Sequence, residues 1–471
     1  MEREAFELDL ARIEAILPRY AIDAPRYTSY PTAPVWSERF GVEEFRGELA
    51  SSSAAARAGE GDALSLYVHV PFCRSLCHFC ACNKIITSKD ELPRRFLEVI
   101  AIEIAAVRDA TGPRSASQQH WGGGTPTHLA PDQIVQLFRA VTDAFAMREG
   151  AEISIEVDPR VTSDDHVAAL RECGFNRISM GVQDFDPAVQ QAIHRIQSVE
   201  QTRHLVELSR ASGFSGVNFD LIYGLPYQSE ASFARTLDQV LAIGPDRVAL
   251  YSYAHVTWLA KQQRGFERKD LPGPSTKLRI LIGAIERFLG AGYRYIGLDH
   301  FAKPDDELSQ ALDDRTLRRN FMGHTTQAGV DLIGFGPSAI SELRASYAQS
   351  QRALDDWQAA VRERGLATMR GHRLTRDDSE RRWAIGRLMC HGELRAEEFE
   401  AEFGERFASR FARELDDLAP LVDDGLVERA RDGSLALTPL GRLLVRNVAM
   451  VFDAYLAEQK KSAQPMFSRS V

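Results

Sequence analysis

The stretch YVHVPFCRSLCHFCACNK, residues 67–84, holds four of the six cysteines in this 471-residue chain. They are Cys73, Cys77, Cys80 and Cys82. A disulfide framework would spread its cysteines along the sequence, whereas these lie close together. Clustered thiols of this kind favour a reducing compartment and a role in metal binding or redox chemistry.

Three kinds of centre compete for these thiols. A structural zinc ion takes four tetrahedral ligands, usually as two pairs from separate hairpins, and four cysteines in so short a run are cramped for it. A ferredoxin-type cluster binds a cysteine at every iron, and its last cysteine commonly lies at a distance. In the third arrangement Cys73, Cys77 and Cys80 hold three irons of a 4Fe–4S cluster. Phe79 then shields the cluster edge, and the fourth iron stays open for a ligand.

From about residue 64 to 345 the chain alternates β-like runs with helical stretches, which predicts an α/β fold with a parallel sheet covered by helices. The expected strands are LSLYVHV (64–70), QQHWGGG (118–124), EISIEVDP (152–159), RISMGVQDF (177–185), GVNFDLIYGLP (216–226), RVALYSYAHV (247–256), YRYIGLD (293–299) and DLIGFG (331–336). Amphipathic helical segments are expected at 92–109, 130–147, 187–211 and 275–290. Chemistry in parallel sheets gathers at the carboxyl ends of the strands.

Polar residues alternate with apolar ones in several of these expected strands. In EISIEVDP, Ile153, Ile155 and Val157 share one face, and Ser154, Glu156 and Asp158 share the other. The same pattern places Ser179, Gln183, Asn218 and Asp220 on inward faces. Because burying a carboxylate without partners is expensive, these residues predict a wet cavity that holds a ligand. Mutual hydrogen bonding, or exposure at the strand ends, is the alternative.

Both ends of the chain depart from the β–α pattern. Residues 1–62 are expected to form an N-terminal arm and linker, in which the proline-bearing segment 23–36 excludes a regular helix. Residues 63–365 form the expected barrel domain, and residues 366–471 a mainly helical C-terminal domain. Within that last domain, segment 418–450 shows a winged-helix-like pattern. Its would-be recognition helix, 411–425, is acidic, which argues against nucleic-acid binding.

Composition sets further expectations about compartment and partners. The chain has a formal net charge of −9 and an ordinary hydrophobic fraction of 44%. No apolar run approaches the roughly 18 residues that span a bilayer, and the N-terminus has no signal-peptide core. We therefore predict a cytoplasmic protein with no membrane span and no nucleic-acid partner.

The spacing CxxxCx(aromatic)C at Cys73, Cys77, Phe79 and Cys80 resembles the radical S-adenosylmethionine superfamily, as does the glycine run in WGGGTPT (121–127). In that superfamily the methionine part of S-adenosylmethionine chelates the open iron. One electron from a low-potential donor then yields a 5′-deoxyadenosyl radical that abstracts hydrogen. A Gly-Gly motif at this place receives the methionine amino group, and only glycine lets a ligand approach the backbone so closely.

More specifically, the chain resembles the oxygen-independent coproporphyrinogen III oxidase family. The segments that carry this resemblance are PRYTSYPTA, YVHVPFC…CHFCACNK, HWGGGTPT, EISIEVDPR, FNRISMGVQDF, DLIYGLP, DHFAKPDDEL, RNFMGHTT and GLVE…LTPLGRLLVRN. The resemblance implies a partial (β/α)6 TIM-like barrel and a monomer. It also implies decarboxylation of the ring A and B propionates of coproporphyrinogen III to vinyl groups, giving protoporphyrinogen IX in haem synthesis.

The resemblance also implies roles for individual residues. Cys73, Cys77 and Cys80 would bind the cluster, and Cys82 would not. The family is described as holding two S-adenosylmethionine molecules. The first would contact Tyr67, Gly123, Glu156 and Ile340. The second would contact Phe79, Gly124, Thr125, Gln183, Arg195, Asp220 and Ala254. The expected catalytic residues are Tyr67, Glu156, Phe321 and Ile340.

Other features of the sequence distinguish the oxidases of this family from their haem-binding relatives. Haem-binding, chaperone-like relatives usually follow the third cysteine with Asp-Phe and lack the PRYTSYPTA arm, whereas this chain has Ala81-Cys82 and the arm. The family often reads Asn-Phe-Gln-Gly-Tyr-Thr-Thr where this chain has Met322 and His324. Candidate propionate contacts are Arg26, Tyr27, Tyr30, Lys303, Arg318, Arg319 and His324. A haem chaperone, a radical enzyme acting on another tetrapyrrole and a zinc-bearing winged-helix protein remain the alternatives.

Overall fold

The computed structural model describes residues 9–58, 63–257 and 260–456, and these divide into two compact units. Unit 2 comprises residues 36–271 and 327–373, and unit 1 comprises residues 1–35, 272–326 and 374–471. Each unit therefore draws on segments that are far apart in the sequence. The division into three domains with boundaries at residues 62 and 365 remains a prediction, because the two compact units do not test it.

Unit 2 is built on parallel strands, as the β–α rhythm predicts. Neighbouring strands follow the order β16-β15-β14-β13-β1-β4-β5-β6-β7-β8, and pairing is parallel from β13 through β8. The parallel strands are β1 (Ala63–Val70), β4 (Ser115–Gly123), β5 (Ala146–Val157), β6 (Arg177–Gln183), β7 (Gly216–Tyr223), β8 (Arg247–Ser252) and β13 (Asp331–Phe335). The antiparallel extension consists of β14 (Ile340–Leu343), β15 (Ser346–Ser350) and β16 (Thr368–Arg373).

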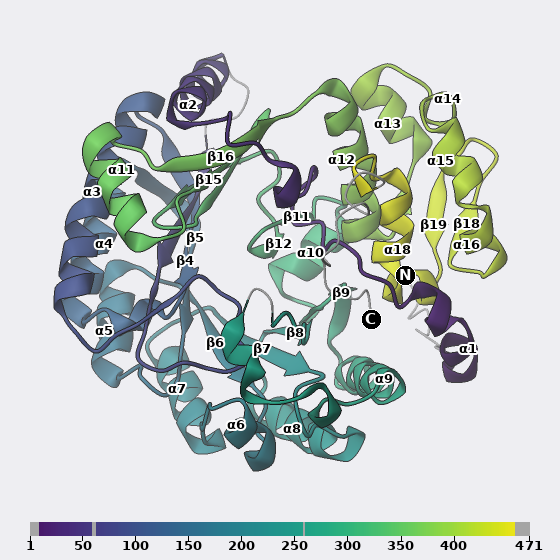
Figure 1. Ribbon diagram of the computed structural model, residues 1–471, viewed down its shortest axis with the longest axis horizontal. Helices are drawn as coiled ribbons and strands as arrows, with labels where there is room; N and C mark the ends of the chain where they lie inside the picture. Colours follow the sequence, from purple (N-terminus) through teal and green to yellow (C-terminus); the bar gives the residue numbers. More distant parts are fainter. Residues whose placement is uncertain (1–8, 59–62, 258–259, 457–471) are drawn as a thin grey trace. The chain divides into compact units, whose positions relative to one another are not determined.

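Helices connect or flank the strands of unit 2 and lie outside them in Figure 1. They are α2 (Val42–Arg57), α3 (Glu91–Thr111), α4 (Pro131–Ala144), α5 (Asp164–Cys173), α6 (Pro187–Ala192), α7 (Val199–Ala211), α8 (Glu230–Ile243) and α11 (Leu354–Arg364). The strands turn fully buried apolar side chains such as Ile155, Met180 and Phe219 toward this helical layer. The predicted α/β class with a parallel, helix-covered sheet is confirmed.

The predicted segments 92–109 and 275–290 match α3 and α9 (Pro274–Gly290) to within two residues, whereas the other two helical segments depart further from their predicted bounds. Segment 130–147 ends as a helix at Ala144, because β5 already begins at Ala146. The continuous helix expected at 187–211 is broken into α6 and α7. His194 adopts a left-handed backbone with φ of 56°, and Ser198 caps a new helix by accepting from the N–H of Gln201. Arg195, one of the predicted cofactor contacts, lies in this break.

Unit 1 is mainly helical. Its helices are α1 (Leu10–Tyr20), α9 (Pro274–Gly290), α10 (Glu307–Asp313), α12 (Arg376–His391), α13 (Ala396–Phe403), α14 (Phe407–Arg410), α15 (Ala412–Asp417), α16 (Ala419–Asp423), α17 (Pro439–Leu443) and α18 (Val445–Ala449). Its strands are β9 (Arg294–Gly297), β10 (His300–Ala302), β11 (Arg318–Asn320), β12 (Gly323–Thr325), β17 (Glu393–Leu394), β18 (Val427–Arg429) and β19 (Leu435–Leu437). The small β17-β19-β18 sheet between helices matches the predicted winged-helix-like pattern.

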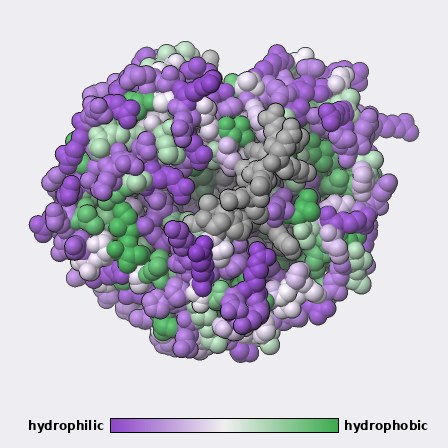
Figure 2. Space-filling model, in the orientation of Figure 1, coloured by the Kyte–Doolittle hydropathy of each residue, from purple (hydrophilic) through white to green (hydrophobic). Residues whose placement is uncertain are grey.

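Hydrophilic side chains cover most of the face seen in Figure 2, and hydrophobic ones form small patches among them. In the described parts of the chain, no helix combines the length and apolar character that crossing a membrane requires.

Candidate active site

The cysteine run forms a loop directly after β1. Short strands β2 (Phe72–Cys73) and β3 (Ile85–Ile86) pair in parallel and close the base of this loop. The N–H of Thr87 donates to the carbonyl of Cys73 over 3.0 Å. Cys77 is buried, Cys73 and Cys80 are half-buried, and Cys82 is exposed. The three cysteines of the predicted cluster motif are therefore less exposed to solvent than Cys82.

Two guanidinium groups point at the sulfur of Cys77. Nη2 of Arg160 lies 3.5 Å from Sγ, and Nη1 of Arg195 lies 3.7 Å from it. Both arginines also bind Oδ2 of Asp158, at 2.6 and 3.0 Å. Burial alone would raise the pKa of Asp158, but these two cations lower it below its ordinary value. The sulfur of Cys77 thus faces two cations that are themselves held by one carboxylate.

The glycine run ends β4 and packs against the cysteine loop. A Cβ at Gly124 would lie 2.7 Å from the carbonyl oxygen of Phe72, and a Cβ at Gly123 would lie 2.6 Å from the ring of His69. Gly123 has φ of 109°, a conformation that favours glycine. Its N–H donates to Oε2 of Glu156 over 3.2 Å. Glycine is therefore needed here by both space and conformation.

Strands β1, β4 and β5 bring a hydrogen-bonded set of side chains to the edge beside this loop. Oη of Tyr67 lies 3.2 Å from Nδ1 of His69, and Nε2 of His69 lies 2.9 Å from the carbonyl of Asn83. His120 bonds Ser154 at 2.7 Å and Glu156 at 3.4 Å. Burial would raise the pKa of Glu156, but the hydrogen bond from His120 and the N–H of Gly123 lower it.

A second polar set lies on the neighbouring strands β6 and β7. Asp220 accepts from Ser179 at 3.0 Å and from Asn218 at 3.2 Å. Burial, followed by repulsion from the Glu156 carboxylate, raises the pKa of Asp220 to about 7. The mutual hydrogen bonding that the sequence left open as an alternative is thus present. Glu156 nevertheless keeps 44% of its side chain exposed, so this set also borders open space.

Arg195 extends from the break between α6 and α7 into the same region. Its side chain is 7% exposed, and Nη2 donates to the carbonyl of Gly181 over 2.6 Å. Its Nε is buried and has no hydrogen-bond partner among the residues that the structure describes. Gln183, at the end of β6, is buried with φ of 67°. Both residues were predicted, and both lie at the carboxyl end of the sheet.

The remaining predicted residues are distributed as follows. Oγ1 of Thr125 lies 3.4 Å from Sγ of Cys73, and Phe79 packs on the apolar cluster formed by Val189, Ile193, Ile222, Leu225, Tyr253 and Phe266. The carbonyl of Ala254 accepts from Gln263 at 3.1 Å, and Ile340 begins β14. Phe321 lies in unit 1, in the turn between β11 and β12. Its role stays a prediction.

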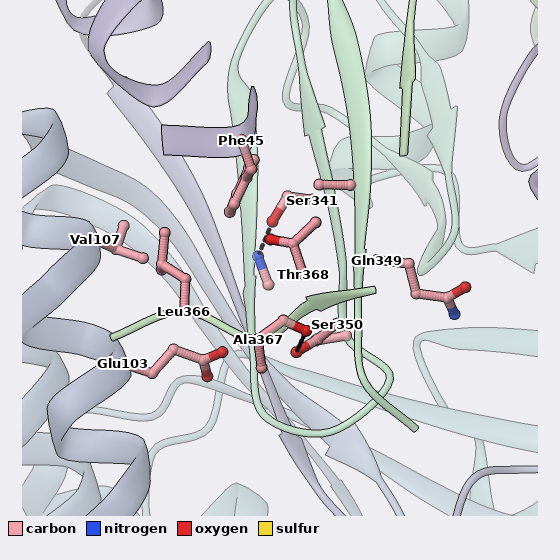
Figure 3. A pocket seen from close by; sticks show the side chains of 12 residues that line it. Phe45, Glu103, Val107, Ser341, Gln349, Ser350, Leu366, Ala367 and Thr368 are labelled. Carbon is pink, nitrogen blue, oxygen red and sulfur yellow. Dashed lines mark hydrogen bonds between the residues drawn. The ribbon is translucent and has the colours of Figure 1, made fainter. Parts of the chain in front are cut away.

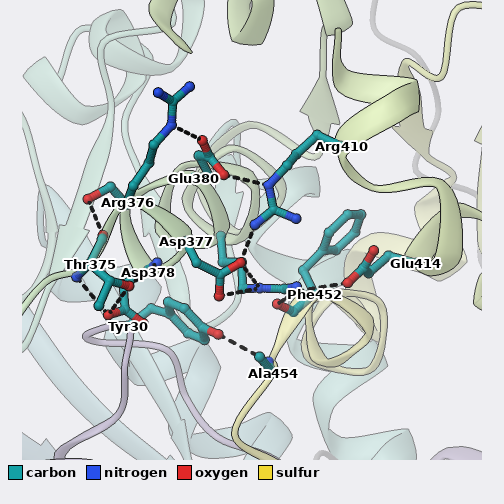
Figure 4. Close-up of polar contacts among 12 residues, drawn as sticks. Tyr30, Thr375, Arg376, Asp377, Asp378, Glu380, Arg410, Glu414, Phe452 and Ala454 are labelled. Atoms are coloured by element: carbon teal, nitrogen blue, oxygen red, sulfur yellow. Dashed lines mark hydrogen bonds and ion pairs between the residues drawn. The ribbon is translucent and has the colours of Figure 1, made fainter. Parts of the chain in front are cut away.

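The arm residues proposed as propionate contacts bond other residues of unit 1. Arg26 pairs with Asp299, and the hydroxyl of Tyr27 donates to Asp453 over 3.0 Å. Tyr30 is 2% exposed and its hydroxyl accepts from the N–H of Ala454 (Figure 4). Since burial raises the pKa of Tyr27, this hydroxyl stays protonated as a donor. These contacts hold the arm to the C-terminal segment.

The sequence analysis missed three residues of this site: His69, His120 and Arg160. The two histidines obey the same alternation that identified Glu156, because Tyr67 and His69 share a face of β1. The alternation of inward and outward side chains over 67–69 and 118–122 would have identified both histidines. Arg160 follows β5 in a loop, where no periodicity marks it.

The donor set fits an iron–sulfur cluster better than a mononuclear ion. In the described ranges, no three or more His, Cys, Asp or Glu side chains converge as a single metal ion requires. A 4Fe–4S cluster instead takes one thiolate per iron, so its ligands stand apart. Close backbone approach at Gly123 and Gly124 and the unpaired Nε of Arg195 supply further contacts for a charged ligand beside the thiols.

Comparisons with known proteins agree with this geometry. Residues 67–240 match the model of the radical SAM superfamily, and residues 374–444 match that of the HemN C-terminal domain. The chain is 45% identical to the oxygen-independent coproporphyrinogen III oxidase of Escherichia coli (strain K12), over 97% of this chain and 98% of that protein. It is 44% identical to the protein of the same name from Pseudomonas aeruginosa, over 95% and 97%.

A solved structure is also similar to this chain over nearly its whole length. It is described as coproporphyrinogen III oxidase (HemN) from Escherichia coli, a radical SAM enzyme. The TM-score is 0.89 at 44% identity, and the match covers 95% of this chain and 99% of that one.

Proposed function

Because the chain belongs to the oxygen-independent coproporphyrinogen III oxidase family of radical SAM enzymes, we propose that it converts coproporphyrinogen III to protoporphyrinogen IX. Each of the two target propionates loses carbon dioxide, one proton and two electrons in all in becoming a vinyl group. The single observation that carries the proposal is the placement of three thiols, the glycine run and Glu156 at one edge of the parallel sheet.

Cys73, Cys77 and Cys80 would hold a 4Fe–4S cluster, and the backbone at Gly123 and Gly124 would lie against S-adenosylmethionine. When bound, these groups supply one-electron reduction and hydrogen abstraction from the substrate. A low-potential electron donor is required, because one electron must enter from outside the chain. Arg160 and Arg195 contact the sulfur of Cys77, and Asp158 holds both guanidiniums in place.

The chain's own polar groups would orient the cofactor. The carboxylate of Glu156 is held ionised by His120 and by the N–H of Gly123, which suits it to an ammonium or ribose hydroxyl. His69 accepts the hydroxyl proton of Tyr67 while its Nε2–H donates to Asn83, so the ring tautomer and the Tyr67 orientation are both fixed. Tyr67, Glu156, Ile340 and Phe321 are proposed at the reacting centre.

We further propose a second S-adenosylmethionine position. Its contacts would be Phe79, Gly124, Thr125, Gln183, Arg195, Asp220 and Ala254. The support is chemical: the buried Arg195 suits a carboxylate, and Asp220 suits a ribose hydroxyl or an amine. Met322 and His324, which differ from the usual family residues, lie in and beside the β11–β12 turn with Phe321.

An anaerobic assay tests the proposal. The protein is reconstituted with iron and sulfide, then given dithionite, S-adenosylmethionine and coproporphyrinogen III, and 5′-deoxyadenosine and porphyrin products are followed by mass spectrometry. We expect both to form, with two carboxyl groups lost. If 5′-deoxyadenosine forms and the substrate survives, the enzyme acts on another tetrapyrrole. If haem binds stably and neither product forms, the protein is a haem carrier.

Two cysteine variants test the ligand assignment in the same preparation. Cys77→Ala should lose the cluster and all cleavage of S-adenosylmethionine. Cys82→Ala should keep the cluster, as measured by iron and sulfide content. A cluster retained in the first variant or lost in the second would overturn the three-cysteine assignment.

A further inference from the structure

Two segments distant in sequence cover the outer side of the cysteine loop. In the first, the carbonyl of Ile193 accepts from the N–H of His78 over 2.9 Å, and His194 contacts the carbonyl of Leu76 at 3.1 Å. The rings of His78 and His194 stack with centroids 5.2 Å apart. This segment therefore lies directly on the middle of the loop.

The second segment is the 3₁₀ helix η3 (Lys261–Gly265), which lies much later in the chain. Gln263 donates to the carbonyl of Phe79 over 2.8 Å, and Gln262 donates to that of Cys80. A Cβ at Gly265 would lie 2.8 Å from the ring of His78. Both segments therefore contact the loop that carries the thiols.

Most of the exposed charged side chains on these segments are basic, and Glu200, at the start of α7, is an exposed acid. Arg74 on the loop itself and Lys261 and Arg264 on η3 are exposed, as are Arg268 and Lys269 just beyond it. Glu267 is the exposed acid within 260–270, and it is already paired with Lys269 at 2.8 Å. The whole chain carries a net charge of −9, so a basic region here contrasts with the rest of the molecule.

An apolar side chain lies on the same segments. Ile196 is 65% exposed, the highest value among the large hydrophobic residues exposed in the described chain. It follows Arg195, whose guanidinium reaches Cys77. A single exposed isoleucine needs no explanation by itself. Beside exposed cations on a redox loop, it matches the composition of a protein contact with an apolar centre and a charged rim.

We propose that Arg74, Ile196, Lys261 and Arg264, named here the cysteine-loop patch, dock an acidic protein that carries one low-potential electron. This inference rests on the proposed function, since it names the partner that reduces the centre held by the cysteine loop. One electron leaves the reduced carrier and enters that centre, and no atom is transferred. Because the chain carries a net negative charge, an acidic carrier is attracted to this basic patch more than to the surface on average, which also orients it.

The test uses a flavodoxin, a small acidic flavoprotein, as the probe. Its binding to the reconstituted full chain is measured by calorimetry at two salt concentrations, for wild type and for a Lys261→Glu, Arg264→Glu double variant. The matched control reverses two exposed arginines on the outer helices α4 and α11, Arg139→Glu and Arg362→Glu. It makes the same change in net charge away from the patch.

We expect the patch variant to bind about tenfold or more weakly at low salt, with the difference shrinking at high salt, while the control changes less than about twofold. Ile196→Ser should weaken binding without altering its salt dependence, because it removes an apolar contact. Equal losses in the patch and control variants, or no saturable binding of the wild type, would overturn the proposal.

A second measurement separates this proposal from the proposed function. With dithionite as the reductant, the patch variant should form 5′-deoxyadenosine and product at the wild-type rate, because no carrier protein is needed. With reduced flavodoxin as the sole reductant, its rate should fall in proportion to the loss of binding. Equal rates with flavodoxin in wild type and variant would exclude the patch, while product formation with dithionite would still support the enzyme.

Discussion

The environment of Cys77 differs from that of the other cysteines in the loop, since it combines burial with two guanidiniums at 3.5 and 3.7 Å. Arg160 contributes one of these contacts and also bonds both oxygens of Asp158. A residue that holds and neutralises a metal ligand typically changes metal affinity by about 10–100-fold when it is removed. We therefore propose Arg160 as a positioning residue for the cluster that Cys77 would hold.

We expect Arg160→Met to bind the cluster about 10–100-fold more weakly, measured as iron retained against increasing chelator. Arg160→Lys, which keeps the charge, should recover part of this loss. Arg171→Met on α5 is the matched control, since that guanidinium bonds backbone carbonyls of Ser212 and Phe175. Unchanged iron retention in Arg160→Met would show that Arg195 alone suffices at Cys77.

Asp220 is a residue of the proposed site that titrates near neutral pH. Its pKa lies at about 7, raised mainly by burial and then by Glu156. Because the folded pKa exceeds the ordinary value of 3.8, the folded protein holds this proton more tightly than the unfolded chain does. Its contribution to stability is therefore complete below that ordinary value and is lost as the pH rises through the folded pKa. The ionised form, however, is the one that attracts a cationic ligand.

We consequently expect S-adenosylmethionine to bind more tightly at pH 8 than at pH 6, and expect Asp220→Asn to lose most of this dependence. The pH dependence is obtained by measuring the dissociation constant of S-adenosylmethionine at both pH values in the reconstituted protein. Asp143→Asn, at an exposed position on α4, is the matched control. An identical pH dependence in wild type and Asp220→Asn would remove Asp220 from the binding site.

Among the elements of unit 2, α3 is tied to the β13–β14 region by one buried carboxylate. Glu103 accepts from the N–H of Gly336 over 2.7 Å with one oxygen and from Nε1 of Trp357 over 3.1 Å with the other. It lines a small pocket with Phe45, Ser341 and Thr368 (Figure 3). Gly336 packs on the carbonyl of His69, so this carboxylate helps to place the turn that precedes Ile340.

Glu103→Gln presents an amide N–H₂ to one of those two donors, which should cost about 1–3 kcal/mol. Burial raises the pKa of Glu103 from 4.5 to about 7, so wild-type stability declines over this pH window as the carboxyl ionises. The deficit of the variant should accordingly shrink from pH 5 to pH 8. Hydrogen exchange of residues 336–339 at both pH values would measure this stability deficit. Glu98→Gln, on the exposed face of α3, is the control. A deficit that grows with pH would contradict the assigned pKa.

The elements that sequence analysis predicted best are those set by local periodicity. Alternation in 152–159 placed Glu156 and Asp158 on the inward face, where the structure has them bonded to His120, Gly123 and Arg195. The break at His194 was missed because the apolar spacing of 187–211 continues across it, and a left-handed residue leaves no periodic signal. Arg160 was missed for a related reason, since its contacts depend on how one loop folds back.

At the scale of the whole molecule, hydrogen bonds between residues 421 or more positions apart join the arm to the C-terminal segment within unit 1. Arg446 on α18 is 4% exposed and donates to the carbonyls of Pro25, over 2.9 Å, and Ala24. Asn447 donates to the carbonyl of Tyr20 over 2.9 Å. The sequence marked the arm as non-helical, but no local pattern could reveal a partner so distant in the chain.

The same segment meets an ionic network on α12. Arg410 pairs with Asp377 and Glu380, and Arg381 bonds Glu414 and the carbonyl of Phe452 (Figure 4). Residues 452–455 are thus held from two sides, by α12 and by Tyr30 of the arm. Loss of the arm contacts should loosen this C-terminal segment while leaving the parallel sheet of unit 2 unaffected.

Arg446→Leu tests this expectation, because it leaves two buried carbonyls of the arm without their donor at a cost of about 1–3 kcal/mol each. Hydrogen exchange should rise at residues 20–31 and 446–455 and stay unchanged in β1 and β4. Arg413→Leu, with a side chain 89% exposed on α15, is the matched control and should leave exchange unaltered. An equal rise throughout the chain would instead mean that the arm stabilises both units together, because global unfolding would then limit exchange everywhere.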